Sequence, residues 1–306
     1  MKNDSLVTTP ASLQEVLDLI TAIRPAARRA DFPSITDLEE IFRSPGIGAD
    51  ARLWRDPSGL PAAYALVHFP YNNLNFEIRE AWWTDELEDE ILEWAQGRMR
   101  ARYGEELAGN TLDGSCRAED GRMTRFFERH GFVKEEVESM VFQAELSTPP
   151  PDALLPEGFT IRALDPAGEV EQALAVHQAA YGTSNFTLED RLAMMNTAAY
   201  RPALDLVAVA PDGTLAGSCV CGVEGAYALD GVVEGYTDPV VVLPRYQGKG
   251  LATALLMSGL VGLYALYARR VQLSTSSTNI GMQRAAEAAG FTCVARSAWF
   301  SLDLPE

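Results

Sequence analysis

The chain has 306 residues, of which 25 are basic and 43 acidic, so its formal net charge is −18. With 47% hydrophobic and 22% charged residues, the composition is that of a globular protein and excludes a disordered, collagen-like or coiled-coil chain. A strongly acidic surface repels nucleic acid and anionic membranes, so neither is expected as a partner.

The cysteines and histidines favour a metal-free protein of the reducing cytoplasm. Cys116, Cys219, Cys221 and Cys293 form neither a disulfide framework nor a C-x-x-C motif. The three histidines lie at no metal-ligand spacing, so no metal is expected. The first residues lack the apolar run of a secretory signal, and the longest apolar stretch, 251–268, is shorter than the roughly 20 residues that cross a bilayer.

The first half is predicted to alternate helices and strands. An amphipathic helix covers 11–17, and residues 56–62 form a turn between two apolar strands, which predicts a β-hairpin. A later helix around Phe126 ends at the C-cap glycine Gly131, and a strand follows it. The predicted order is helix, β-hairpin, strand, helix, strand, helix, strand.

A proline-rich segment, TPPPDALLPE at 148–157, interrupts this pattern as a semi-rigid extended spacer. It divides the chain nearly in half, and the halves repeat one another. The first helix, the hairpin turn and the last helix with its glycine recur in the same order at nearly the same offset. We therefore predict a duplicated domain, with copies at 1–147 and 158–306.

The second half shows the same order of elements. The predicted strands are 159–163, 206–210, 216–224, 232–243, 270–275 and 291–302, and the predicted helices are 170–181, 250–269 and 280–289. Both copies are therefore mixed α/β. The long helix is apolar on nearly all faces, so we expect the other domain or a partner subunit to pack against it. A homodimer is therefore one of the two possibilities.

One loop of the second half can bind phosphate. The segment Val240 to Ala252 is a strand that ends at a proline and turns through two glycines, Gly248 and Gly250, directly into a helix. Glycines let the backbone approach a ligand closely, and a helix N-terminus carries about half a positive charge. A strand-to-helix turn with glycines for geometry alone is the alternative.

The charge around this loop argues against that alternative. Residues 239–286 contain five basic residues and no Asp or Glu, in a chain whose net charge is −18. The basic residues are Arg245, Lys249, Arg269, Arg270 and Arg284. An electropositive island therefore surrounds the glycine loop.

The loop motif Arg245-x-x-Gly248-x-Gly250 resembles the acetyl-CoA pyrophosphate motif of the GCN5-related N-acetyltransferases. Asn279, followed eleven residues later by Gly290-Phe291, resembles the next helix and strand of that family. The resemblance covers 158–304 and extends to the first half through the repeat, as in tandem acetyltransferases of the mycothiol synthase kind. It implies two GNAT-like domains, each a mostly antiparallel twisted sheet flanked by helices.

The resemblance also implies a cofactor site. The strand Val240 to Val242 would pair with the pantetheine arm, amides of the loop and of the first helical turn would hold the pyrophosphate, and Asn279 would bind the pantetheine end. Arg245 and Lys249 would supply countercharge. The implied residues are Val240, Val241, Val242, Arg245, Gln247, Gly248, Lys249, Gly250, Leu251, Ala252, Thr253 and Asn279.

The first half departs from this pattern. At the start of the equivalent helix, 85–93, it carries six acids in nine residues. Acids suit a helix N-terminus but repel a pyrophosphate. We therefore expect the first copy to be a degenerate domain without a cofactor loop.

The candidate catalytic residues lie on the strand before the loop. Glu234, Tyr236 and Asp238 alternate, so they point to one face. Acyl transfer to an amine needs a proton acceptor, and Glu234 is our first choice and Asp238 the second. The family's leaving-group tyrosine is replaced by Ala286, so Tyr236 or water would have to act as the acid. Solvated acids at a strand edge are the alternative.

These observations predict an acetyl-CoA-dependent N-acetyltransferase with one active site in the second half. Its acceptor is expected to be the amine of a small, cationic molecule, because the protein is strongly acidic. The alternative is a non-catalytic acyl-CoA-binding or sensory protein.

Overall fold

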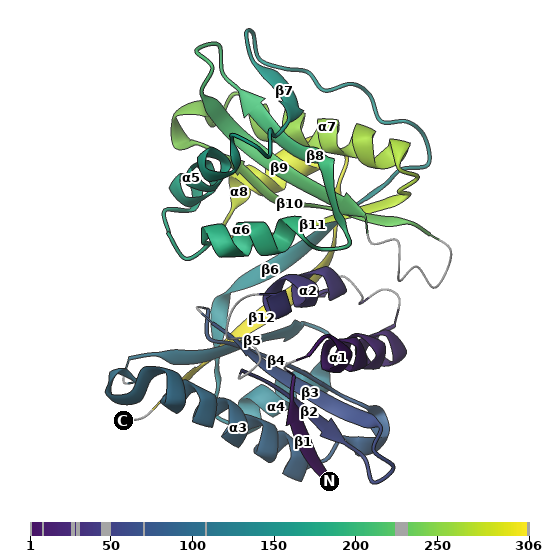
Figure 1. The fold of residues 1–306 in the computed structure, drawn as a ribbon, viewed down its shortest axis with the longest axis vertical. Coiled ribbons are helices and arrows are strands. Elements are labelled where there is room, and N and C mark those ends of the chain that lie inside the picture. Colours follow the sequence, from purple (N-terminus) through teal and green to yellow (C-terminus); the bar gives the residue numbers. More distant parts are fainter. Residues whose placement is uncertain are drawn as a thin grey trace. The chain divides into compact units, whose positions relative to one another are not determined.

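The computed structural model describes residues 2–7, 9–25, 28, 31–43, 50–69, 71–107, 109–223 and 232–304. The chain forms two compact units. Unit 1 comprises Met1–Glu138 and Ser297–Glu306, and unit 2 comprises Ser139–Arg296. Both mix helices with strands, which confirms the predicted α/β class (Figure 1).

Unit 1 begins with a strand and two helices. Its elements are β1 (Lys2–Leu6), α1 (Pro10–Ile23), α2 (Ile35–Arg43), β2 (Ala51–Arg55), β3 (Pro61–His68), β4 (Asn73–Ile78), α3 (Asp85–Tyr103), β5 (Thr111–Arg117) and α4 (Gly121–Arg129), together with parts of β6 (Val133–Glu145) and β12 (Thr292–Asp303). Its sheet has the order β1-β2-β3-β4-β5-β12, and β4 and β5 pair in parallel. Aromatic side chains fill the core, where Phe127 stacks on Phe300 with ring centroids 4.6 Å apart.

Unit 2 repeats this plan. Its own elements are β7 (Thr160–Ala163), α5 (Val170–Tyr181), α6 (Leu188–Met195), β8 (Tyr200–Val209), β9 (Leu215–Val223), β10 (Glu234–Val242), α7 (Leu251–Ala265), β11 (Arg270–Ser276) and α8 (Ile280–Ala288). With the second part of β6, the strand order is β6-β11-β10-β9-β8-β7. All its strand pairs are antiparallel except β10 with β11.

Helices cover both faces of the unit 2 sheet. Apolar residues of α7 and α8 pack with one set of alternating strand residues, including Val242 and Val271. Residues of α5 pack with the opposite set, including Val241, and Met194 of α6 packs against Val220. Figure 1 shows α5 and α6 on one side of the sheet and α7 and α8 on the other. The site described below lies where these layers meet.

The compact units do not divide at the proline-rich segment. Residues 139–145 of β6 pair with β11 in unit 2, and residues 297–303 of β12 pair with β5 in unit 1. Each unit thus completes its sheet with strand residues that lie, in the sequence, on the other side of the proline-rich segment at 148–157. The predicted domain limits, 1–147 and 158–306, assign these strand segments to the other copy.

Some predicted elements differ from the structure. The helix expected at 250–269 ends at Ala265, because the chain turns at Tyr267, where φ is +65°. The short elements β1, α2 and α6 were not predicted. Val261 of α7 is 36% exposed in the described part of unit 2. The expectation that the other domain or a partner subunit covers this helix therefore stays a prediction.

Candidate functional site

The candidate site lies where two parallel strands separate. β10 and β11 pair from Glu234 and Arg270 as far as Tyr236 and Gln272. Beyond Tyr236, β10 forms a bulge against β9 between Thr237 and Val240. A cavity of about 590 Å³ opens next to this part of β10. It is lined by Ala180, Tyr181, Val240, Val241, Val242, Tyr246, Gln247, Gly248, Gly250, Leu251, Ala252, Thr253, Asn279, Gly281, Met282, Arg284 and Ala285.

The glycine loop brings the N-terminus of α7 to this cavity. Gly248 and Gly250 have φ of +72° and +84°, a backbone conformation that favours glycine. Gly250 is the N-cap residue of α7, no side chain caps this end, and the first turn carries no acid. The first backbone N–H groups of a helix have no partner within it. These N–H groups and the helix dipole therefore create an anion-binding position at the cavity.

The cavity gathers most of the predicted cofactor residues. Ten of them line it, namely Val240, Val241, Val242, Gln247, Gly248, Gly250, Leu251, Ala252, Thr253 and Asn279. Arg245 and Lys249 do not line it. The Arg245 guanidinium lies 4.9 Å from the centre of the Tyr246 ring, and Lys249 Nζ lies 5.7 Å from it. Both cations are thus held against an aromatic face beside the loop.

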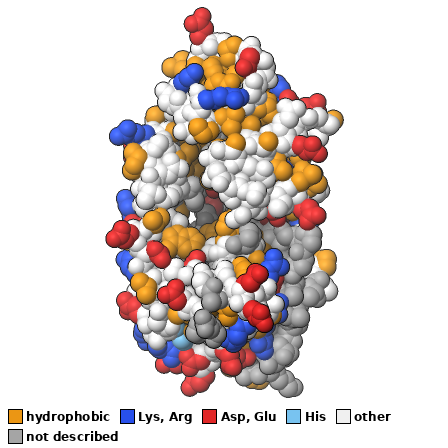
Figure 2. All heavy atoms as spheres, turned by 90° about the vertical axis from the view of Figure 1, so that its left-hand side faces the viewer, with side chains coloured by type: hydrophobic (Ala, Val, Ile, Leu, Met, Phe, Trp, Pro, Cys, Tyr) orange, Lys and Arg blue, Asp and Glu red, His pale blue; other side chains and the backbone are white. Residues whose placement is uncertain are grey.

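Tyr181 and Arg284 are among the lining residues that were not predicted as site residues. Tyr181, at the end of α5, is 56% exposed and comes from a helix far from the motif in sequence, so no spacing pointed to it. Arg284, in α8, belongs to the basic island, and this charge pattern was the signal that could have identified it. In the part of unit 2 drawn at the top of Figure 2, basic and hydrophobic side chains lie together.

Asn279 and the alanines of α8 have defined local roles. Asn279 caps α8, because its Oδ1 accepts a hydrogen bond from the Met282 N–H at 3.1 Å. Its amide nitrogen remains the donor that can face a ligand. Ala285 lines the cavity, whereas Ala286 is fully buried in the core beneath it. The position where the family carries a tyrosine therefore presents no hydroxyl.

The three candidate catalytic residues lie on β10 beside the cavity and are absent from its lining. Glu234 Oε1 accepts a hydrogen bond from Arg270 at 2.5 Å, and its side chain is 18% exposed. The Tyr236 ring lies against Gly222 of the neighbouring strand. Asp238 is exposed at the bulge. The burial pattern of β10 alternates up to Asp238, as the sequence predicts for residues on one face.

Two other groups are held in uncharged forms. Burial, with Arg191 nearby, lowers the pKa of His177 to about 4, and its ring packs against those of Tyr181 and Phe186. A hydrogen bond with Cys221 and burial raise the pKa of the Cys219 thiol well above its ordinary range. Neither group is therefore charged near neutral pH. All four cysteines are free thiols.

Unit 1 has a cavity at the equivalent place. Its volume is about 670 Å³, and its walls come from the end of α1, from β4, and from the residues before α3 and α4. The equivalence extends to the cap of α4, where Asp120 Oδ1 accepts from the Met123 N–H at 3.1 Å, the same distance as in the Asn279 cap. The duplication read from the sequence thus appears as matching local structure.

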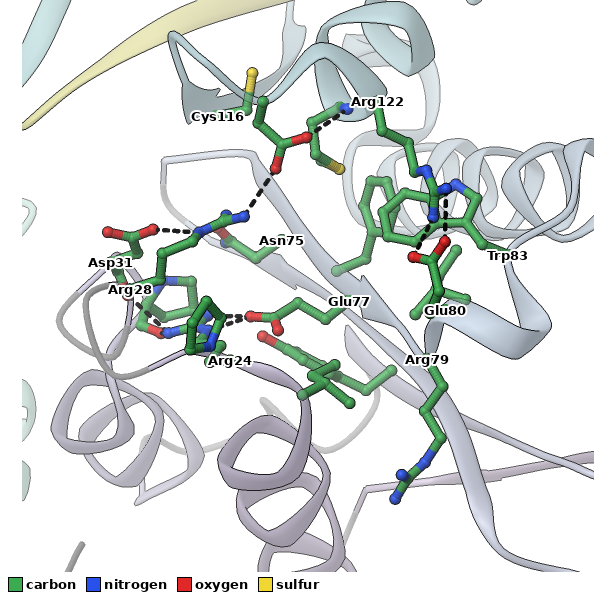
Figure 3. Close-up of a pocket in the computed structure, with 18 of the residues that line it drawn as sticks. Arg24, Arg28, Asp31, Asn75, Glu77, Arg79, Glu80, Trp83, Cys116 and Arg122 are labelled. Atoms are coloured by element: carbon green, nitrogen blue, oxygen red, sulfur yellow. Dashed lines mark hydrogen bonds and ion pairs between the residues drawn. The ribbon is translucent and has the colours of Figure 1, made fainter. Parts of the chain in front are cut away.

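Side chains of opposite charge pair with one another in the unit 1 cavity (Figure 3). Arg24 pairs with Glu77, Arg28 bridges Asp31 and Asp120 at 2.9 Å each, and Arg122 bonds Glu80. Arg79 points away from these pairs and donates to the Pro61 carbonyl at 2.7 Å.

Helix α3, the counterpart of α7 in unit 1, differs from it in its first turn. The side chain of Thr84 caps α3 by accepting from the Leu87 N–H, and the first turn carries Asp85, Glu86 and Glu88. Acidic side chains there repel an anion from the helix N-terminus. The arrangement at the start of α7 therefore has no counterpart at the start of α3.

The described residues give no sign of a metal site or of a membrane span. No group of three or more His, Cys, Asp or Glu side chains among them could hold a metal ion. None of their helices is both long and apolar enough to cross a membrane.

Comparison with known proteins gives consistent matches. Residues 172–291 match the model of the acetyltransferase (GNAT) family. A mycothiol acetyltransferase of Kineococcus radiotolerans is 29% identical over 299 residues, which cover 91% of this chain and 90% of that protein. Another, from an Arthrobacter species, is 32% identical over 146 residues, and the match spans about half of each chain, 46% and 45%.

Solved structures share the whole fold. A GCN5-related N-acetyltransferase from Sphaerobacter thermophilus superposes with a TM-score of 0.72 at 26% identity, covering 96% of this chain and 93% of that one. A tandem GNAT protein from the clavulanic acid biosynthesis pathway superposes with a TM-score of 0.70 at 16% identity, covering 99% and 98%. The two-unit architecture is therefore one that a known tandem protein also has.

Proposed function

We propose that the chain is an acyltransferase of the GNAT family and that unit 2 transfers acetyl from acetyl-CoA to the amine of a small molecule. One observation carries the proposal. The cavity at the separation of β10 and β11 meets the N-terminus of α7, whose first turn has no acid and no side-chain cap. This is the arrangement that binds a phosphate.

The lining residues fit an extended ligand with an anionic end. Gly248 and Gly250 leave open space where a side chain would stand, so backbone N–H groups can approach a pyrophosphate. Val240 to Val242 offer a strand edge facing the cavity, and Asn279 offers its amide nitrogen. When bound, acetyl-CoA supplies an activated acyl group as a thioester.

We assign the proton acceptor to Glu234. Arg270 donates a hydrogen bond to its Oε1 at 2.5 Å and so fixes the carboxylate on β10, and a carboxylate is a group that can accept a proton. Asp238, exposed at the bulge, is the second candidate. Because Ala286 has no hydroxyl, the proton for the departing thiolate comes from Tyr236 or from water.

For the acceptor, we propose a small, cationic amine. The curated relatives are named mycothiol acetyltransferases, so an amine related to mycothiol belongs in any substrate panel. The net charge of −18 favours a cationic molecule. A non-catalytic acyl-CoA-binding protein is not favoured, because the relatives are named as acetyltransferases.

The loop can be tested with a matched pair of glycine variants. Gly250→Asp places a side chain and a negative charge at the N-terminus of α7, so acetyl-CoA binding should fall below detection in titration calorimetry. Gly59→Asp, in a hairpin turn of unit 1 at φ +91°, imposes similar backbone strain away from the site and should leave the affinity unchanged. A Gly250→Asp protein with wild-type affinity would refute the site.

A further inference from the structure

A row of polar side chains crosses three strands of unit 2. The strand registers place Glu145, Arg270 and Glu234 side by side, and Gln143, Gln272 and Tyr236 in the next row. Their strand neighbours Val271 and Leu273 belong to the core under α7 and α8. The polar rows therefore lie on the opposite face, the one that α5 and α6 cover elsewhere in the sheet (Figure 1).

The hydrogen bonds in this row have a fixed direction. Glu145 is a carboxylate and can only accept, so the Gln143 amide nitrogen donates to its Oε1 at 2.8 Å. That leaves Gln143 Oε1 as an acceptor, and the Gln272 amide nitrogen donates to it at 2.8 Å. The orientation of the Gln272 amide follows from this chain of bonds. Its carbonyl oxygen, Oε1, must be the atom at the free end.

This end atom is buried and lacks a donor. Gln272 Oε1 has essentially no exposed surface, and among the described residues no group donates a hydrogen bond to it. Buried polar atoms are nearly always hydrogen-bonded, so a buried acceptor of this kind marks a place where a donor is required. The atom can accept from an N–H or an O–H and can donate to neither.

Gln272 lies beside the cavity and does not line it. Gln272 pairs with Tyr236 at the last position where β10 and β11 run together, and the cavity beyond is lined from Val240 onward. The anion-binding end of the cavity lies at Gly248 and Gly250, on the other side of Val242. Gln272 is therefore on the side of the cavity away from the phosphate position.

We propose that Gln272 is a specificity-determining residue that accepts a hydrogen bond from the amine of the acceptor substrate. The inference rests on the proposed function of unit 2 and names the recognition chemistry of that same site. The adjacent row adds charge selectivity, because Glu145 and Glu234 place two carboxylates around the single guanidinium of Arg270. A surplus negative charge next to a buried acceptor suits a protonated amine, which carries several N–H donors and a positive charge.

The test compares two substitutions at one position. Gln272→Leu keeps the size but removes the acceptor, so KM for an amine should rise at least 10-fold. Gln272→Glu keeps the acceptor and adds negative charge, so KM should stay within about 3-fold of wild type. The probes are glucosamine, putrescine and lysinamide, each followed by release of free thiol from acetyl-CoA. Gln14→Leu, an exposed glutamine of unit 1 that bonds Asp18, is the control and should leave KM unchanged.

The outcomes separate this inference from the proposed function. Acetyl-CoA affinity, measured by calorimetry, should be the same in both Gln272 variants, which also shows that they fold. If wild type turns over an amine and Gln272→Leu does so with unchanged KM, the role of Gln272 is overturned while the function stands. The role is also overturned if KM rises as much in Gln272→Glu as in Gln272→Leu. It is overturned as well if wild type binds acetyl-CoA and acetylates none of the amines. If wild type fails to bind acetyl-CoA, the proposed function itself fails.

Discussion

Arg270 holds two carboxylates that differ widely in exposure. The side chain of Glu234 is 18% exposed and lies 2.5 Å from the guanidinium, whereas that of Glu145 is 62% exposed and lies 3.4 Å from it. An exposed ion pair contributes little, because water competes for both charges. The close contact with Glu234 therefore fixes one carboxylate in place, and the looser contact leaves the other in solvent.

This difference allows a prediction for Glu234. Glu234→Gln preserves the shape but cannot take a proton, so turnover should fall by roughly 10²–10⁴-fold with cofactor affinity nearly unchanged. The matched control is Glu169→Gln, which alters another arginine-paired carboxylate of unit 2 with the same 18% exposure and should keep at least about half of the activity. Steady-state thiol release measures both. If Asp238→Asn loses turnover and Glu234→Gln retains it, Asp238 is the proton acceptor instead of Glu234.

Helix α7 packs very closely against the strands of its sheet. A side chain at Gly259 would place its first carbon 2.6 Å from the Sγ of Cys221, and one at Gly262 would stand 2.2 Å from Leu204 Cδ2. Real Cβ atoms essentially never come this close to another atom, so a side chain at either position would force Cys221 or Leu204 to move. The close fit holds the N-terminus of α7, and with it the anion-binding loop, against β10.

A pair of glycine-to-alanine changes tests this packing. Gly259→Ala should destabilise unit 2 by about 1–3 kcal/mol, because the methyl group overpacks a buried strand. Gly97→Ala, in the middle of α3 with open space around it, should stabilise the protein by about 0.5–1 kcal/mol through helix propensity alone. Urea unfolding followed by circular dichroism measures both. A Gly259→Ala protein as stable as Gly97→Ala would contradict the packing argument.

The two units share a fold but differ in the chemistry of their cavities. In unit 2 an uncapped helix N-terminus lines the cavity, whereas the start of the equivalent helix α3 in unit 1 is capped and acidic. Ion pairs such as Arg24 with Glu77 also occupy the walls of the unit 1 cavity. Space for a ligand was thus retained in both copies, while the charge needed for a pyrophosphate was retained in one.

This contrast predicts the binding stoichiometry. Acetyl-CoA should bind one site per chain in titration calorimetry, because acids at the start of α3 repel the pyrophosphate. The Gly250→Asp protein should then show no binding at all. Two equivalent sites, or a residual site in Gly250→Asp, would show that unit 1 also binds the cofactor.

Much of unit 2 could be predicted because its local signals agree. The hairpin turn at residues 211–213, the helix α5 and the glycine loop each had a clear pattern, and the bounds of α5 match, whereas β8 begins at Tyr200, before the strand predicted at 206–210. The loop motif also located most of the cavity lining. Tyr181 could not be found this way, because it reaches the site through the packing of α5 on the sheet, which no spacing in the chain encodes.

Other features depended on contacts between distant residues. The Glu234–Arg270 pair and the amide chain from Glu145 to Gln272 follow from strand register, and the sequence does not specify which strands are neighbours. The exchange of strand segments between the units was missed for the same reason. The proline-rich segment marked a boundary in sequence, while hydrogen bonding between strands set a different one.

The exchanged strands bear on the order in which the protein can fold during synthesis. Unit 1 needs residues 297–303, which pair with β5 and carry Phe300 into its core, and these are synthesised only after all of unit 2. Folding of successive domains usually proceeds from the N-terminus as each is completed. Here unit 1 would wait with an open edge at β5 until residues 297–303 have been made, and unit 2, complete at Arg296, would be the first to finish.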